Sequence, residues 1–257
     1  MDVLKGDGTV GNPYLIEDIV DWNLFAGRIN NGDSFEGMNV KLAENIGSVT
    51  SPVTMMAGKD ETYCFKGIFD GNGKTMIVAY NTTESVCAPF RYVNNATIKN
   101  LTVQGVINTS SDYASGLVGN SIGSVTISNC VSKIEINSSY NGNGYDAGFI
   151  GLNANTVSIQ NCTFAGKLLG VDTISSNGFI GKNNGRVTVR NCLFIPSEIT
   201  MDDSDSWTFV KDGTKTINDS YFIQSFGTEQ GIQATLQSQN DNTILKTFEG
   251  GYQCYVP

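Results

Sequence analysis

The chain has 257 residues, of which 40% are hydrophobic, and its 16 Lys and Arg residues are outnumbered by 25 Asp and Glu residues. The net charge of −9 argues against a nucleic-acid partner, because an acidic surface repels phosphate. Histidine is absent, which excludes a His general base, Ser-His and Cys-His dyads and most zinc sites. No run approaches roughly 18 consecutive apolar residues, so we expect no membrane insertion of this segment.

Near the start of the chain, residues 18–29 predict an amphipathic helix. Its apolar residues fall on one helical face: Ile19, Trp22, Phe25, Ala26 and Ile29. Asp18 suits the N-cap position, and the run Asn30-Asn31-Gly32 is typical of a helix end. We expect this helix to cap one end of the fold.

Three segments in the middle of the chain align without gaps. They are Val125–Cys130, Val157–Cys162 and Val187–Cys192, spaced roughly 30 residues apart, with weaker copies at Ala96–Leu101 and Lys215–Ser220. Each strong copy reads apolar, Thr or Ser, apolar, polar, Asn, Cys. Alternation with a period of two predicts a strand with one buried face, so Val and Ile should form an inward column.

Two further columns follow when the copies are placed in register. Thr97, Thr126, Ser158, Thr188 and Thr216 form an outward column, and Asn100, Asn129, Asn161 and Asn191 form an asparagine column. An Asn side chain can hydrogen-bond the identical residue one rung away, and Asn tolerates the left-handed conformation that turns a chain.

A second strand is predicted at each Gly-x-x-Gly segment, and a third after each Cys. The segments are Gly116–Gly119, Gly148–Gly151 and Gly178–Gly181. Glycine at both ends of two apolar residues indicates a short inward strand with tight corners.

Three short strands per coil predict an all-β fold, a right-handed parallel β-helix with an N-terminal helical cap. A β-propeller is the alternative, but its four-stranded blades need more residues than this spacing leaves. We expect one domain over residues 1–257. Its N-terminal cap and first coil would occupy residues 1–60, its central coils residues 61–225, and its C-terminal cap residues 226–257, with a second short helix at Ile232–Gln239.

The six cysteines divide into two groups. Cys130, Cys162 and Cys192 follow an Asn in the same repeat, so we expect a column of buried free thiols. The other three, Cys64, Cys87 and Cys254, lie outside this column, and the sequence does not indicate their state.

The segment Phe65–Thr75 reads F-K-G-I-F-D-G-N-G-K-T, and the chain opens with Gly6–Thr9 and Asn12–Ile16. These residues resemble bacterial surface proteins with GLUG-type repeats, whose signature is F-x-G-x-F-D-G-N-G-x-T. Ala88–Phe90 departs from the expected first G-L-F-G, as does Thr208–Lys211 in the fourth coil. The resemblance implies an extracellular or cell-surface, adhesin-like or glycan-associated domain of a larger protein, with no shared catalytic residue.

Four segments that precede the Gly-x-x-Gly strands should emerge at one corner of successive coils: residues 108–115, 137–147, 171–177 and 202–207. The candidate ligand-binding residues there are Tyr113, Tyr140, Tyr145, Asp146 and Trp207, accompanied by Asp112 and Asp172. Aromatic rings stack on the C–H faces of sugars, and polar groups bond their hydroxyls. We therefore expect a glycan or a host surface protein as partner, no cofactor and a monomeric domain. The alternative is a set of variable loops with incidental tyrosines.

Three other functions remain open from the sequence. The first is a polysaccharide lyase or hydrolase on the same fold, for which no paired carboxylates fall in matching columns, so no catalytic residue is predicted. The second is calcium binding, with Asp202, Asp203 and Asp205 as a weak candidate set, since adjacent acidic residues in a loop are more often simply solvated. The third is a purely structural stalk.

Overall fold

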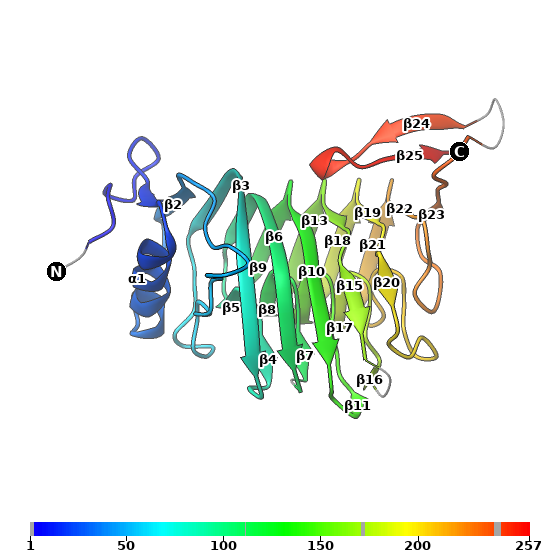
Figure 1. The fold of residues 1–257 in the computed structure, drawn as a ribbon, viewed down its shortest axis with the longest axis horizontal. Helices are drawn as coiled ribbons and strands as arrows, with labels where there is room; N and C mark the ends of the chain where they lie inside the picture. Colours follow the sequence, from blue (N-terminus) through cyan, green and yellow to red (C-terminus); the bar gives the residue numbers. More distant parts are fainter. Residues whose placement is uncertain (1–2, 111, 171–172, 239–242) are drawn as a thin grey trace.

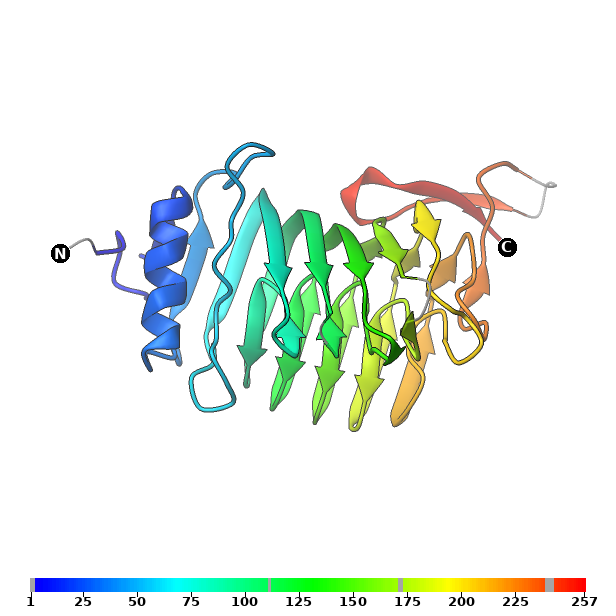
Figure 2. The same cartoon turned by 60° about the horizontal axis from the view of Figure 1, so that its bottom comes forward.

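The structure, a computed structural model, describes residues 3–110, 112–170, 173–238 and 243–257. The coils stack along one axis into an all-β parallel solenoid of about seven turns, with a helix at the N-terminal end (Figures 1 and 2). The predicted fold class is confirmed. In the part of the chain that is described, no helix has the length and apolar character needed to cross a membrane.

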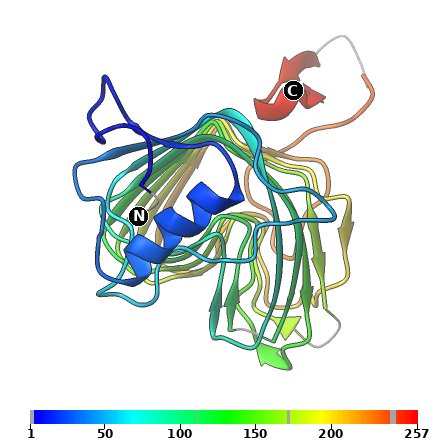
Figure 3. The ribbon, with the colours of Figure 1, turned by 60° about the vertical axis from the view of Figure 1, so that its left-hand side comes forward.

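Helix α1 (Ile19–Asn30) lies across the open end of the first coil (Figure 3). The Asp18 carboxylate accepts hydrogen bonds from the N–H groups of Val20 and Asp21 at 2.8 and 3.0 Å, which confirms the predicted N-cap. The helix buries Trp22, whose ring meets that of Phe90 edge-on at 5.6 Å. The cap therefore shares one aromatic core with the coils and covers strand edges that would otherwise be open.

The predicted repeat strands form one parallel sheet in the expected order. It runs from β21 (Thr214–Asn218) through β18 (Arg186–Arg190), β13 (Thr156–Gln160) and β9 (Ser124–Ser128) to β6 (Thr97–Thr109), and continues into β3 (Ile68–Thr82), β2 (Asn39–Leu42) and β1 (Tyr14–Ile16). The inward Val and Ile residues of β9, β13 and β18 are at most 2% exposed. The alternation thus assigned both faces correctly.

The asparagine column forms a ladder of side-chain hydrogen bonds. Asn129 donates to Asn100, Asn161 to Asn129 and Asn191 to Asn161, with N···O distances of 2.9–3.0 Å. All four residues have φ between 51° and 54°. Both predicted roles of these residues, the ladder and the left-handed corner, are confirmed.

The Gly-x-x-Gly segments lead into a second parallel sheet. Its strands are β5 (Phe90–Val93), β8 (Val118–Ser121), β12 (Ile150–Asn153) and β17 (Ile180–Asn183). The predicted tight corners hold at one end only: the chain bends at Gly116, Gly148 and Gly178, whereas Gly119, Gly151 and Gly181 lie within the strands. None of these six glycines has a positive φ. They are needed for close approach instead: a Cβ at Gly178 would lie 1.9 Å from the carbonyl oxygen of Thr208 on the next coil.

The third strands confirm the prediction that a strand follows each Cys. After Cys130, Cys162 and Cys192 come β10 (Val131–Ser138), β14 (Thr163–Phe164) and β19 (Leu193–Phe194), and β22 (Tyr221–Phe222) follows Ser220 in the weaker copy. Strands β15 (Lys167–Leu169) and β20 (Glu198–Ile199) lie further along the same wall. The long strands β3 and β6 pass round the asparagine corner and pair with this wall in their second halves.

A side lobe projects from the coils, because β3, β6 and β10 run on beyond the triangular body (Figure 3). Its other wall is made of short paired strands. These are β4 (Val86–Cys87) with β7 (Tyr113–Ala114), and β11 (Gly142–Asn143) with β16 (Thr173–Ile174). The segments predicted to carry the binding residues form this second wall.

The predicted second helix is wrong. Ile232–Gln233 form strand β23, which pairs with β22, and Thr235 bridges to Tyr255; Gln239 lies outside the described residues. Ile232 and Leu236, the apolar residues that suggested a helical face, are 42% and 61% exposed. A helix here would therefore lack the tertiary packing of an apolar face that stabilises most helices. The chain ends in an antiparallel hairpin, β24 (Ile244–Thr247) and β25 (Gln253–Val256), joined through a 3-10 turn at Glu249–Gly251 and lying beside the coils (Figure 1).

All six cysteines are buried and free. Cys130, Cys162 and Cys192 are at most 1% exposed, and the thiol of Cys162 donates to the carbonyl of Gln160 at 3.1 Å. Burial raises the pKa of the Cys162 thiol well above its ordinary value. The predicted column of buried thiols is confirmed.

Candidate functional site

The four corner segments do stack on one another. Ser115, Ala147, Asn177 and Trp207 are joined in this order by parallel bridges, one residue from each successive coil. Side chains at equivalent positions of these segments therefore lie one rung apart, roughly 5 Å along the solenoid axis. The corner is a continuous surface on the side lobe.

Two of the predicted tyrosines form a stacked pair. Tyr113 and Tyr145 each lie two residues before a bridging residue, and their rings are 5.5 Å apart with an interplanar angle of 14°. The Lys182 ammonium, which comes from β17 in the next coil, lies 4.7 Å from the centre of the Tyr145 ring. This stack is held by aromatic and cation–π contacts, and both tyrosines are half-buried.

Tyr140 lies beside this pair. Its hydroxyl donates a hydrogen bond to the Asp112 carboxylate, and this bond raises the pKa of Tyr140. No other ring and no cation is stacked on Tyr140 within the described part of the chain. Tyr140 therefore differs from the stacked pair: it is half-buried, with Gly142 and Gly144 next to its ring, and it has no aromatic or cation–π partner in that part of the chain. We refer to Tyr113, Tyr140 and Tyr145 as the tyrosine cluster.

Asp146, which the sequence placed among the ligand-binding residues, lies inside the side lobe. Its side chain is fully buried, and one carboxylate oxygen accepts from the N–H of Ala114 at 2.9 Å while the other has no hydrogen-bond partner. Desolvation raises its pKa to about 7. Asp146 is thus behind the tyrosines, not on the surface that they line.

Trp207 lies two coils further along the corner than Tyr145 and shows no ring contact with the tyrosine cluster. Its backbone N–H donates a hydrogen bond to the side-chain oxygen of Asn177, in the coil before it, at 2.7 Å. The Lys211 ammonium lies 5.1 Å from the centre of the indole ring. The ring is half-buried, and its exposed part extends the aromatic surface along the solenoid axis.

Two of the three carboxylates in the acidic run next to Trp207 are already bonded within the protein. Asp205 pairs with Lys211 at 2.5 Å and accepts from the Ser175 hydroxyl, and Asp202 accepts from the N–H of Ser204 at 2.7 Å. Asp203 is exposed. Within the ranges that the structure describes, no three acidic or cysteine side chains are grouped to hold a metal ion. Asp172 lies outside those ranges.

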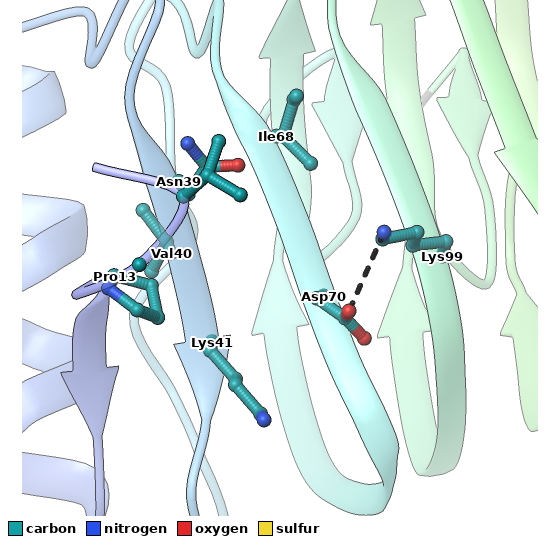
Figure 4. A pocket seen from close by; sticks show the side chains of 9 residues that line it. Pro13, Asn39, Val40, Lys41, Ile68, Asp70 and Lys99 are labelled. Carbon is teal, nitrogen blue, oxygen red and sulfur yellow. Dashed lines mark ion pairs between the residues drawn. The ribbon is translucent and has the colours of Figure 1, made fainter. Parts of the chain in front are cut away.

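A pocket that the sequence did not indicate lies at the N-terminal end of the first sheet (Figure 4). It has a volume of about 330 Å³ and lies between residues 10–13 and the outer faces of β2, β3 and β6. Its charged residues are Lys41, Asp70 and Lys99, with Asp70 and Lys99 paired at 3.5 Å. The alternation of the strands predicts that these side chains face outward. The pocket itself was not predictable, because it forms only where residues 10–13 pack over the sheet.

Stacked parallel coils with a helical cap define this protein as a parallel β-helix. No family model matches the chain. Over 123 residues, or 46% of this chain, it is 32% identical to halomucin from Haloquadratum walsbyi, and the match spans 1% of the length of that protein. A crystal structure from Bacteroides ovatus, described as a "putative immunoglobulin A1 protease", aligns with a TM-score of 0.55 and 13% identity, covering 97% of this chain and 94% of that one. This likeness shows a shared fold.

Proposed function

We propose that this chain is a non-catalytic glycan-binding domain of a larger, adhesin-like surface protein with GLUG-type repeats, and that the ligand binds at the tyrosine cluster. The observation that carries the proposal is the ring of Tyr140, which is half-buried and carries no ring or cation contact among the described residues, beside the stacked pair of Tyr113 and Tyr145. An extracellular location is supported by the fold shared with a protein described as acting on an immunoglobulin, since immunoglobulins are extracellular, and by the local similarity to a protein named as a mucin.

The chemistry of the tyrosine cluster suits a sugar. The Tyr140 ring can stack on the apolar C–H face of a pyranose, while the Asp112 carboxylate accepts from a hydroxyl group and the Lys182 ammonium donates to another. Tyr113 and Tyr145 are already held against each other, so little conformational entropy is lost when a ligand binds next to them.

The corner also favours an extended ligand over a single sugar. Trp207 lies two rungs beyond Tyr145, a distance of about 10 Å at roughly 5 Å per rung. A polysaccharide that follows the corner can therefore contact the tyrosine cluster and the indole ring together. Single sites of this kind are weak, and many copies of a surface protein would supply avidity.

The test is a glycan array with the purified domain, followed by titration of the best ligand. We expect Tyr140→Ala to lower the affinity by about tenfold or more, as loss of an aromatic contact at a hot spot does. Tyr140→Phe keeps the ring and should retain most of the binding. The control is Tyr63→Ala, which removes an exposed tyrosine outside the tyrosine cluster.

Three outcomes count against the proposal. Equal binding by the wild type and Tyr140→Ala would place the ligand elsewhere. If the domain binds no glycan on the array, a purely structural role as a spacer would be favoured. Accumulation of reducing ends or unsaturated products, with or without calcium, would show an enzyme.

A further inference from the structure

The outward face of the first sheet carries mainly positive charge, although the protein as a whole has a net charge of −9. Strands β2, β3, β6, β9, β13, β18 and β21 present alternate residues outward on the face opposite the core. Among these outward residues, Asp70 is the sole carboxylate along the stretches paired in this sheet. The cations are Lys41, Lys99, Arg186 and Arg190.

One row of this face runs straight along the solenoid axis. The strand registers place the following residues in line: Lys41, Asp70, Lys99, Ser128, Gln160, Arg190 and Asn218. A parallel row holds the hydroxyl column of Thr97, Thr126, Ser158, Thr188 and Thr216. The stretch from Lys41 to Arg190 covers about 24 Å at roughly 4.8 Å per rung. Its three cations are separated by Asp70 on one side of Lys99 and by the uncharged Ser128 and Gln160 on the other.

Lys41, Arg186 and Arg190 of this face are available to a ligand, whereas Lys99 is paired with Asp70. Arg186 and Arg190 are exposed, and within the described ranges neither they nor Lys41 form an ion pair with the protein. Asp70 is held in place by the side chain of Asn100 at 2.9 Å, as well as by Lys99. At its N-terminal end the row enters the pocket of about 330 Å³, where Lys41 and Lys99 lie on either side of Asp70 (Figure 4).

We propose that this face binds an acidic polysaccharide that carries uronate carboxylates, laid along the solenoid axis with one sugar unit in the pocket. Lys41, Lys99 and Arg190 would bind carboxylates, and the hydroxyl column would bond sugar hydroxyls. The surface differs from the tyrosine cluster in position and in chemistry, and it does not depend on the function proposed there.

Charge spacing selects a polysaccharide over a nucleic acid. The row offers three cations and one carboxylate over about 24 Å, whereas a nucleic-acid strand carries a phosphate roughly every 3.4 Å along duplex DNA. The remaining acidic surface would repel so dense an anion. A polyuronate has a lower charge density and many hydroxyl groups, which match the Ser, Thr and Gln side chains between the cations.

The experiment is calorimetric titration with polygalacturonate at low salt, with dextran as the uncharged comparison. We expect the wild type to bind polygalacturonate and not dextran, and the affinity to fall as salt increases. The variant Lys41→Gln/Lys99→Gln/Arg190→Gln should bind at least about tenfold more weakly. A control of equal charge change, Lys59→Gln/Lys74→Gln/Lys133→Gln, removes cations outside this face and should stay within about twofold of the wild type.

Other outcomes overturn the proposal. It fails if the wild type does not bind polygalacturonate, or if the two triple variants lose equal affinity, which would show only bulk charge. It also fails if poly-dT binds more tightly than polygalacturonate and loses its binding in the first triple variant, since the face would then be a nucleic-acid site. Tyr140→Ala should leave polygalacturonate binding unchanged, and a loss in that variant would assign this ligand to the tyrosine cluster instead.

Discussion

Gly181 passes so close to Tyr145 that a Cβ atom at position 181 would lie 1.9 Å from the Tyr145 carbonyl oxygen. Gly181 is in β17 of the second sheet, and Tyr145 is in the side lobe of the coil before it. The corresponding glycines of the two preceding coils are similar: a Cβ at Gly151 would meet Tyr113, and one at Gly119 would meet Val86. The second glycine of each Gly-x-x-Gly segment therefore lets the side lobe lie flat against the coils.

We predict that Gly181→Ala lowers the free energy of unfolding by about 2 kcal/mol or more, because backbone must move to accommodate the methyl group. The matched control is Gly27→Ala in α1, where a Cβ would meet no atom within 4 Å. This second change should stabilise the protein by about 0.5–1 kcal/mol through helix propensity. Urea unfolding measures both, and equal stability of Gly181→Ala and the wild type would contradict the close approach.

The asparagine ladder leads to a second prediction. Asn161→Ala removes a side-chain hydrogen bond on each side and places Ala at φ 52°, so we expect a loss of about 2 kcal/mol. Asn161→Gly removes the same bonds but tolerates this φ, and it should lose only about half as much. The difference between their urea midpoints isolates the backbone contribution. If the two variants are equally stable, the left-handed conformation is not a reason for Asn at this corner.

The stacking of the coils was predictable because side-chain alternation and the 30-residue repeat are local signals that point to the same columns. Ile127, Ile159 and Val189 had to share one face once their segments were in register. The role of the glycines was not predictable, since it depends on which part of the neighbouring coil crosses them. The C-terminal hairpin was missed for a similar reason: its pairing with the coils is non-local, whereas Ile232 and Leu236 have a helical spacing.

For the candidate site, the sequence correctly brought the four corner segments together, because coils of equal length return each loop to the same place. The sequence did not predict that Tyr145 reaches the surface while Asp146, the next residue in the chain, is buried. The N–H groups of Tyr145 and Ala147 bond the coil before them, and Asp146 between them is buried inside the lobe while Tyr145 is half-buried. The presence of the lobe follows from the unusual length of β3 and β6. The pocket beside Lys41 was missed because no local pattern predicts which loop covers it.

The cysteine column gives a third prediction. The native protein should react slowly with a thiol reagent at Cys130, Cys162 and Cys192, because all three are buried and burial keeps Cys162 protonated. In guanidinium chloride the same residues should react at the rate of a free thiol. Mass spectrometry of the labelled peptides measures each site separately. Fast labelling of Cys162 in the native state, or a disulfide at any of the three, would contradict a packed interior column.

The buried carboxyl group of Asp146 gives the last prediction, which concerns the pH dependence of stability. Burial raises its pKa from 3.8 to about 7 in the folded protein, with a minor contribution in the same direction from Asp112. A carboxyl group whose pKa is raised by folding is protonated in the folded state and ionised in the unfolded state between those two values. Its stabilising contribution is therefore complete below about pH 4 and is lost as pH rises towards 7, by at most about 1.4 kcal/mol per pH unit.

Asp146→Asn removes this titration while keeping an oxygen that can accept from the Ala114 N–H. The variant should gain stability relative to the wild type as pH rises from 4 to 7, and the difference should level off above pH 7.5. Asp202→Asn is the control, since Asp202 is exposed and hydrogen bonds with Ser204 lower its pKa; its difference from the wild type should not increase over this range. The measurement is the urea midpoint of the wild type and of both variants at pH 4.5, 6 and 8. A constant difference between Asp146→Asn and the wild type would mean that Asp146 is ionised throughout, and that the side lobe admits water to its unpartnered oxygen.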